Sequence, residues 1–144
     1  EPGIETYFTS ALSQEFYRSK VGKVVNVDQS ELNLIGVLTS VIVSPTVKKA
    51  SGDTSVPYLP NGAVLTTAYK VTVRVSVSVI RQSDKSVIWS GNFDGERSYS
   101  AASVSLAGIN SVNPLYNLSA KRQNIQLLAN DLMAEAHDRI TENF

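Results

Sequence analysis

Residues 69 to 82 read YKVTVRVSVSVIRQ, and this stretch decides the fold class. Large apolar side chains alternate with small or polar ones, which is the period-two pattern of a strand with one buried face. The face predicted to be buried carries Tyr69, Val71, Val73, Val75, Val77 and Val79. The opposite face carries Lys70, Thr72, Arg74, Ser76 and Ser78. At about 3.4 Å per residue this strand would be roughly 35 Å long or more, and its apolar face needs a cover.

Two amphipathic helices are predicted to supply that cover. Apolar residues recur three and four positions apart over residues 4–19 and again from about 118 to 143. Both helices can then cover the apolar face of the same sheet. We therefore expect an α+β fold, a two-layer sandwich with two helices packed on one face of a mostly antiparallel sheet of about four strands.

The other strands follow from β-branched runs bounded by turn residues. The predicted strands, in chain order, are residues 21–27, 32–43, 69–82 and one that starts at Val87. Residues 32–43 are apolar on both faces, which predicts a central strand. Two polar stretches, 44–68 and 98–117, are predicted to be long loops. No linker or internal repeat divides the chain, so residues 1–144 are predicted to form a single domain.

The composition disfavours several classes of function. Thirteen basic residues balance thirteen acidic ones, which argues against nonspecific binding to nucleic acid or to an anionic membrane surface. The chain has no cysteine, so disulfides, thiolate metal sites and cysteine nucleophiles are excluded. No stretch approaches the roughly 20 apolar residues of a membrane-spanning helix. The opening Glu1-Pro2-Gly3 lacks an initiator methionine, which suggests a piece of a longer precursor.

The sequence gives little support for an enzyme. His137 is the only histidine, so a multi-histidine metal site is excluded, and we expect a boundary residue half covered by its neighbours. No GxSxG, GxGxxG or Walker pattern is present. Gly91 and Gly95 lie inside a strand pattern, where glycine marks a bulge or a close approach of backbone. Asp94 and Glu96 are explained by a solvated strand end. We predict no catalytic residue, metal or cofactor.

Two short basic pairs and one loop are candidates for binding. Lys48 and Lys49 lie beside the first long loop, and Lys121 and Arg122 lie at the predicted start of the last helix. Because amines there oppose the helix dipole, the second pair suits an anionic ligand, although a solvated helix end also explains it. The apolar residues Tyr58, Leu59 and Val64 of the first loop could contact a partner or fold back on the sheet.

Several segments, in chain order, resemble the LptE family of lipopolysaccharide-assembly lipoproteins of Gram-negative outer membranes. They are EPGIETYFTSALSQEFYRS at 1–19, ELNLIGVLTSV at 31–41, AYKVTVRVSVSVIRQSDKSVIWSGNFDGERSY at 68–99, and a last helix that ends in ENF. The resemblance implies a non-enzymatic protein on the periplasmic side of the outer membrane, anchored by a lipidated cysteine. The anchor cysteine and the family's first strand would precede Glu1 and are not in this sequence.

The resemblance also implies partners. A family member plugs the lumen of the β-barrel protein LptD, helps that barrel to assemble and assists lipopolysaccharide delivery to the outer leaflet. The polar face of residues 69–82 is compatible with a polar barrel interior. The resemblance also implies that lipid A phosphates bind basic side chains. Lys121 is the first candidate, and Arg122, Lys48 and Lys49 are further candidates. The alternative is a lipoprotein of similar layout that activates a cell-wall synthase or serves a secretion or lipid-transport complex.

Overall fold

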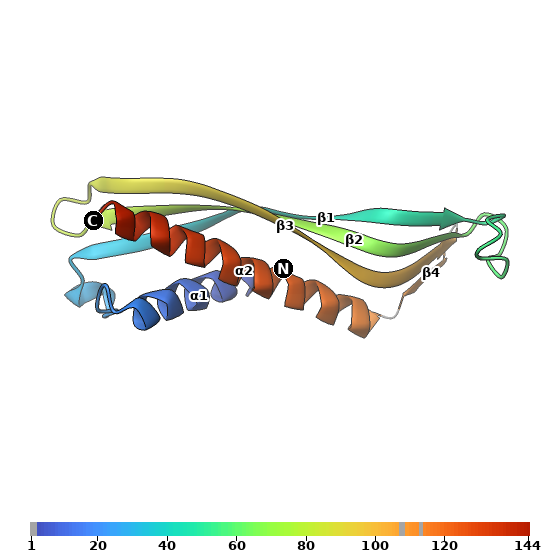
Figure 1. The fold of residues 1–144 in the computed structure, drawn as a ribbon, viewed down its shortest axis with the longest axis horizontal. Coiled ribbons are helices and arrows are strands. Elements are labelled where there is room, and N and C mark those ends of the chain that lie inside the picture. The colour runs from blue at the N-terminus through green and yellow to red at the C-terminus, as the bar shows by residue number, and fades with distance from the viewer. Residues whose placement is uncertain (1–2, 107–108, 113) are drawn as a thin grey trace. The chain divides into compact units, whose positions relative to one another are not determined.

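The computed structural model describes residues 3–106, 109–112 and 114–144, with side chains described for residues 3–106 and 117–144. Figure 1 shows an α+β fold in which two helices accompany one sheet. The elements are α1 (Ile4–Ser19), the 3-10 helix η1 (Val27–Gln29), β1 (Leu32–Ala50), β2 (Val64–Arg81), β3 (Val87–Leu106), β4 (Ile109–Val112) and α2 (Pro114–Glu142). This arrangement confirms the predicted fold class.

The sheet consists of three long strands and one short one, in the order β1-β2-β3-β4. The four-residue strand β4 pairs antiparallel with the end of β3, with Ser103 opposite Val112 and Leu106 opposite Ile109. Each strand is therefore a neighbour of the one that precedes it in the chain, as expected for an antiparallel sheet with short connections.

Two of the predicted strands are placed differently in the structure. Residues 21–27 do not form a strand, and Val21, Val24 and Val27 are exposed, because β-branched residues form a strand only where another strand can pair with them. The strand predicted to be central, residues 32–43, belongs to β1 at an edge of the described sheet. On its second apolar side Ile35 and Val37 are exposed, while Val41 and Val43 are half-buried.

Both predicted loops are shorter than expected because the strands are longer. β1 continues to Ala50 and β2 begins at Val64, so the first connection spans residues 51–63. β3 continues to Leu106, and α2 already begins at Pro114. Serine and alanine carry no clear period in residues 98–106, and the strand there is imposed by pairing with its neighbours in the sheet.

The chain packs as two compact units. The first consists of Glu1–Val41, Val73–Gly95 and Gln126–Phe144, and the second of Ile42–Thr72 and Glu96–Ile125. Residues of β1, β2, β3 and α2 occur in both units. Each unit has its own group of buried side chains.

The first unit is built on the apolar face of β2. Val73, Val75, Val77 and Val79 are almost completely buried, which confirms the predicted alternation. Both helices contribute buried residues to this unit, namely Ile4, Phe8 and Ala11 of α1 and Leu128, Ala129, Leu132, Met133, Ala136 and Ile140 of α2. In Figure 1, α1 and the C-terminal half of α2 lie on the same side of the sheet.

Gly95 of β3 brings α2 close to the strand. A Cβ atom at Gly95 would lie 3.1 Å from Leu128 and 3.2 Å from Leu132 of α2. At Gly91, a Cβ would lie 2.7 Å from the Trp89 ring. The close neighbours of both glycines are therefore side chains, from α2 at Gly95 and from β3 itself at Gly91, whereas the sequence analysis predicted a bulge or a close approach of backbone.

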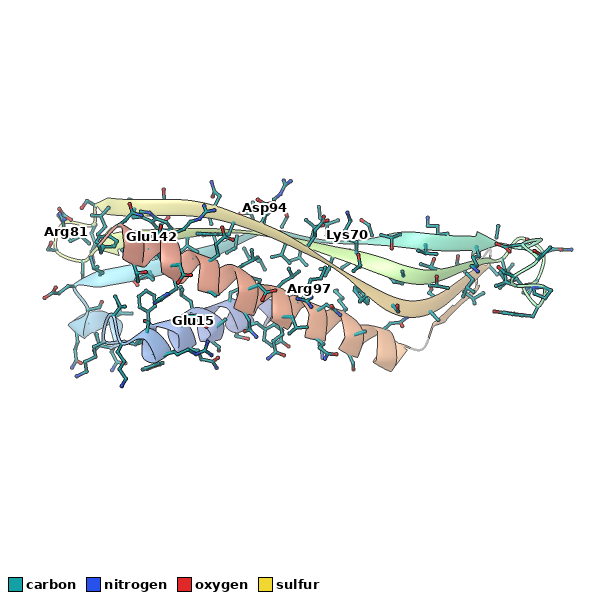
Figure 2. The ribbon with its side chains drawn as sticks, in the orientation of Figure 1. Glu15, Lys70, Arg81, Asp94, Arg97 and Glu142 are labelled. Carbon is teal, nitrogen blue, oxygen red and sulfur yellow. The ribbon has the colours of Figure 1, made fainter. Side chains whose placement is uncertain are left out.

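The turn between β2 and β3 is held by Asp84. Its carboxylate accepts hydrogen bonds from the Ser86 hydroxyl at 2.6 Å and from the Ser86 backbone N–H at 3.1 Å. Arg81, labelled beside this turn in Figure 2, forms an exposed ion pair with Asp84 at 3.4 Å. The predicted turn residues 83–86 therefore act through a side chain that organises the local backbone.

The second unit has a smaller core around the first connection. Val56, Leu59 and Ala63 are buried together and pack against Leu65, Val104 and Leu106. Across the sheet in this unit, Lys70 of β2 pairs with Glu96 of β3 at 3.2 Å. Both side chains are well exposed, so this pair contributes little to stability.

Candidate functional site

A small pocket in the second unit contains the first-ranked lysine of the sequence analysis. It has a volume of about 280 Å³, and its walls come from β2, β3 and the first turns of α2. The lining residues are Tyr69, Tyr99, Ala101, Ser103, Asn117, Leu118 and Lys121. We call this feature the Tyr99 pocket. It combines an amine, an amide, two phenols and a hydroxyl around a partly apolar floor.

Two tyrosines on neighbouring strands form one wall of the Tyr99 pocket. The rings of Tyr69 and Tyr99 are stacked, with centroids 5.8 Å apart and planes inclined by 20°. Burial, together with the nearby Tyr69, raises the pKa of the Tyr99 hydroxyl above its ordinary value. The Tyr99 phenol is therefore protonated at neutral pH and can donate a hydrogen bond to a ligand oxygen.

Asn117 fixes the base of the same pocket. Its Nδ2 donates a hydrogen bond to the Ala102 carbonyl of β3 at 3.1 Å, which ties the start of α2 to the strand. The Asn117 Oδ1 atom is buried and has no hydrogen-bond partner, and it is the one such atom among the described side chains. A buried acceptor in this state is costly, so it needs an explanation.

Lys121 lies deeper in α2 than the sequence indicated. Because α2 begins at Pro114 and not near Leu118, Lys121 is beyond the first turn, where the helix dipole acts most strongly. The dipole argument for an anion at Lys121 is therefore wrong. The lining of the Tyr99 pocket replaces it as the reason to consider this lysine.

The other predicted basic residues are placed outside the Tyr99 pocket. Arg122 follows Lys121 on α2 and is exposed. Lys48 is exposed near the end of β1, and the neighbouring Lys49 donates a hydrogen bond from Nζ to the Ser55 hydroxyl at 2.8 Å. Among the described residues that line the pocket, Lys121 is the one from the predicted set.

The candidate partner residues of the first connection differ in exposure. Tyr58 is 72% exposed, whereas Leu59 is buried in the small core and Val64 is half-buried at the start of β2. Of the three, Tyr58 is the one that presents most of its side chain to a partner.

The first unit contains a larger, mostly apolar cavity of about 620 Å³. It lies between α1, residues 22–34 and the β1–β2 part of the sheet, and Met133 of α2 also contributes. Its apolar lining includes Phe8, Leu12, Phe16, Leu34, Leu38 and Val77. The polar side chains in its lining, such as Glu5, Lys23 and Glu31, carry charges of both signs, so the cavity does not select an anion.

His137 takes part in a contact that resembles part of a catalytic triad. It is 6% exposed, which is less than the half-covered state predicted for it. Its Nε2 lies 2.8 Å from the Ser19 hydroxyl, and its Nδ1 lies 3.1 Å from Asp138 Oδ1. Phe16 packs edge-on against the ring at a centroid distance of 4.8 Å.

This arrangement is poorly suited to hydrolysis. Ser19 ends α1, so unpaired carbonyls and the negative end of the helix dipole surround it, and these would destabilise an oxyanion. Asp138 is the next residue on the same helix and its side chain is 77% exposed, whereas the acid of a working triad is buried. The contact joins the end of α1 to α2.

Two further features bear on function. Within the residues that the structure describes, no group of three or more histidine, cysteine, aspartate or glutamate side chains could hold a metal ion. In the same residues, no helix is both long enough and apolar enough to cross a membrane.

Comparison with known proteins identifies the family. The profile of the LptE family, described as lipopolysaccharide-assembly, matches residues 1–143. The chain belongs to the LptE family. Members of this family are lipopolysaccharide-assembly lipoproteins of the outer membrane, which confirms the resemblance noted in the sequence.

A solved structure supports the same fold for this LptE chain. A Caulobacter crescentus CB15 protein, described as a lipoprotein, superposes with a TM-score of 0.58 over 95% of this chain and 80% of that chain. The two are 8% identical, so this likeness bears on the fold alone. Comparison with curated proteins finds no match.

In this LptE chain, the sequence analysis predicts Lys121 as a binding residue but none of the residues that line the Tyr99 pocket with it. The sequence predicts Tyr69 on the buried face of a strand and places Tyr99, Ser103 and Asn117 in the second long loop. The two tyrosines indicate a shared aromatic surface only when β2 and β3 are known to be neighbours, since their rings then stack.

Proposed function

We propose that this chain is the periplasmic domain of a non-enzymatic outer-membrane lipoprotein that binds lipopolysaccharide at the Tyr99 pocket. The observation that carries the proposal is the family match over residues 1–143, taken together with a pocket that places Lys121 beside two stacked tyrosines. The proposal treats residues 1–144 as one functional domain, held at the membrane by a lipid anchor outside this sequence.

The chemistry of the pocket suits the phosphorylated end of lipid A. The Lys121 ammonium can donate charge-assisted hydrogen bonds to phosphate oxygens, and these are stronger than neutral ones. The Tyr99 and Ser103 hydroxyls add neutral donors, and the tyrosine rings give an apolar surface. Because the pocket is small, it would hold the head of the ligand and leave the acyl chains outside.

A charge-reversal series tests this site. Lys121→Glu should weaken lipopolysaccharide binding about tenfold or more, since it removes a charge-assisted hydrogen bond and adds repulsion. Arg122→Glu, Lys48→Glu and Lys49→Glu change the net charge by the same amount and serve as matched controls, with expected losses of about threefold or less after screening by salt. Equal losses for all of these variants would mean that binding follows net charge and not the pocket.

We further propose that the polar face of β2 and the exposed Tyr58 contact an LptD-type outer-membrane β-barrel. Along this face the Ser76 hydroxyl donates a hydrogen bond to Asn92 Oδ1 of β3 at 2.6 Å, and Lys70 pairs with Glu96 of β3 at 3.2 Å. Hydroxyl and charged side chains of this kind suit the polar interior of a barrel. In this role the domain would plug the barrel, help it to assemble and assist delivery to the outer leaflet.

Copurification tests the partner. The anchored full-length protein, extracted from outer membranes, should bring down one large β-barrel, and Tyr58→Asp should reduce the yield several-fold, while Tyr17→Asp, also an exposed tyrosine, should not. Recovery of a cell-wall synthase or a secretion complex in place of a barrel would contradict the proposal.

A further inference from the structure

Asn117 makes a hydrogen bond that joins two walls of the Tyr99 pocket. The lining residues of β3 are Tyr99, Ala101 and Ser103, and those of α2 are Asn117, Leu118 and Lys121. The Asn117 Nδ2 donates to the carbonyl of Ala102 at 3.1 Å. Because Ala102 stands between two of the lining residues of β3, this bond connects the strand and the helix at the level of the pocket itself.

The bond lies next to the described pairs between β3 and β4. The first of these pairs along β3 joins Ser103 and Val112. Ala102 comes one residue earlier in β3, and its carbonyl accepts from a side chain of α2. Asn117 therefore adds a partner to β3 beside the end of β4, and it ties the first turns of α2 to the strand.

The same amide has an energetic cost. Its Oδ1 is buried and has no hydrogen-bond partner among the described residues. The opposite orientation of the amide would bring Oδ1 against the Ala102 carbonyl, two acceptors facing each other, so the contact fixes the orientation. An apolar side chain would avoid the buried acceptor but would take this donor away from the Ala102 carbonyl. The benefit of an amide at this position is therefore its donor, which contacts the strand and not a ligand.

Lys121 lies one helical turn after Asn117. The two residues are four positions apart on α2, so they share a face of the helix, and a shift of the first turns would move both. We propose that Asn117 is a positioning residue of the Tyr99 pocket, whose hydrogen bond to Ala102 holds Lys121 in place. The inference rests on the proposed function for the statement that Lys121 binds the ligand, while the positioning itself depends on no ligand.

Tyr99 reports the position of the α2 wall without a ligand. Burial is the main cause that raises the pKa of its hydroxyl, and the α2 residues line the same pocket. In Asn117→Leu this wall loses its tie to β3, so the pKa of Tyr99 should fall towards its ordinary value. NMR titration of the protein with isotope-labelled tyrosine measures this pKa.

Asn124→Leu is the matched control. Asn124 is also a half-buried amide of α2, but its Nδ2 donates to the Ala120 carbonyl of the same helix at 2.8 Å, and it does not line the pocket. In this variant the pKa of Tyr99 should stay at its wild-type value. Unfolding midpoints verify that the variants are folded. Asn117→Ala removes the same donor without added bulk and replaces Asn117→Leu if that variant does not fold.

A double-mutant cycle tests whether Asn117 acts through Lys121. Lipid A in detergent micelles is the probe, and its affinity for the full-length protein is measured by titration. Asn117→Leu should weaken binding about fivefold, since a displaced ammonium makes poorer hydrogen bonds to phosphate. In a Lys121→Met background, Asn117→Leu should change the affinity by about twofold or less, because residues that act through one contact are not additive.

The two measurements separate this inference from the proposed function. An unchanged Tyr99 pKa in a folded Asn117 variant overturns the positioning role, whether or not lipid A binds. Losses that add in the Lys121→Met background overturn the action through Lys121 and leave lipopolysaccharide binding standing. A wild-type protein that does not bind lipid A overturns the proposed function, and the pKa of Tyr99 then decides the positioning role alone.

Discussion

Gly95 sets the distance between β3 and α2. The space beside it is filled by Leu128 and Leu132, so a side chain at this position would have to displace a packed helix. We predict that Gly95→Val destabilises the protein by about 1–3 kcal/mol, the usual cost of overpacking. Urea unfolding measures this difference.

Gly36 of β1 provides the control for Gly95. No atom lies within 4 Å of a Cβ built at Gly36, so Gly36→Val should change stability by about 0.5 kcal/mol or less, or increase it slightly through β propensity. If the two valine variants were equally stable, the packing of α2 on Gly95 would be refuted.

Asp84 makes the stability of the β2–β3 turn depend on pH. Hydrogen bonds from the Ser86 hydroxyl and backbone N–H lower the pKa of this carboxyl, and the nearby Arg81 lowers it further. Because the folded-state pKa lies below the unfolded one, the contribution is fully present above the ordinary aspartate pKa of about 3.9 and is lost as pH falls through the folded-state pKa.

Asp84→Asn therefore should lower the stability near neutral pH more than it does near about pH 2.5. Ser86→Ala removes one donor and should show the same trend with a smaller amplitude. Denaturant unfolding of the three proteins at both pH values gives the comparison. A deficit in Asp84→Asn that persists unchanged in acid would rule out an ionised Asp84 as its source.

Among the elements, β2 has an alternating pattern that predicts how substitutions on each of its faces change stability. Val73 is completely buried, while its neighbour Thr72 lies half-buried on the opposite face. Val73→Thr should destabilise the protein by about 1–3 kcal/mol, because it buries a hydroxyl of similar shape without a partner. The reverse change, Thr72→Val, should stay within about 0.5 kcal/mol. Thermal or urea unfolding measures both variants. If Thr72→Val were the more destabilising of the two, Val73 and Thr72 would have been assigned to the wrong faces of β2.

The sequence predicted the elements whose own residues specify them. β2 and the two amphipathic helices carry strong local periods, and Asp84 and Ser86 form their turn without help from distant residues. The ends of β1 and β3 could not be predicted, since their serine, lysine and alanine residues form strands only through pairing with β2 and β4. Residues 32–43 were predicted to be a central strand because both of their faces are apolar. The sequence does not show what covers each face, and in the structure they belong to the edge strand β1.

For the whole molecule, the family and the general role were readable from several short segments in order, and the family profile over residues 1–143 confirms them. The candidate site could be predicted only in part. Lys121 stood out by charge, but the Tyr99 pocket brings together residues from β2, β3 and α2, and no local sequence pattern encodes that meeting.

The position at which lipopolysaccharide contacts the protein distinguishes binding at the Tyr99 pocket from binding elsewhere on α2. A photo-crosslinking residue is placed in the full-length protein in cells, either as Leu118→benzoylphenylalanine in the Tyr99 pocket or as Leu127→benzoylphenylalanine at an exposed position on the same helix. If the Tyr99 pocket binds lipopolysaccharide, an adduct should form at position 118 and none above background at 127. Adducts of equal yield at both positions, or at 127 alone, would contradict binding at this pocket.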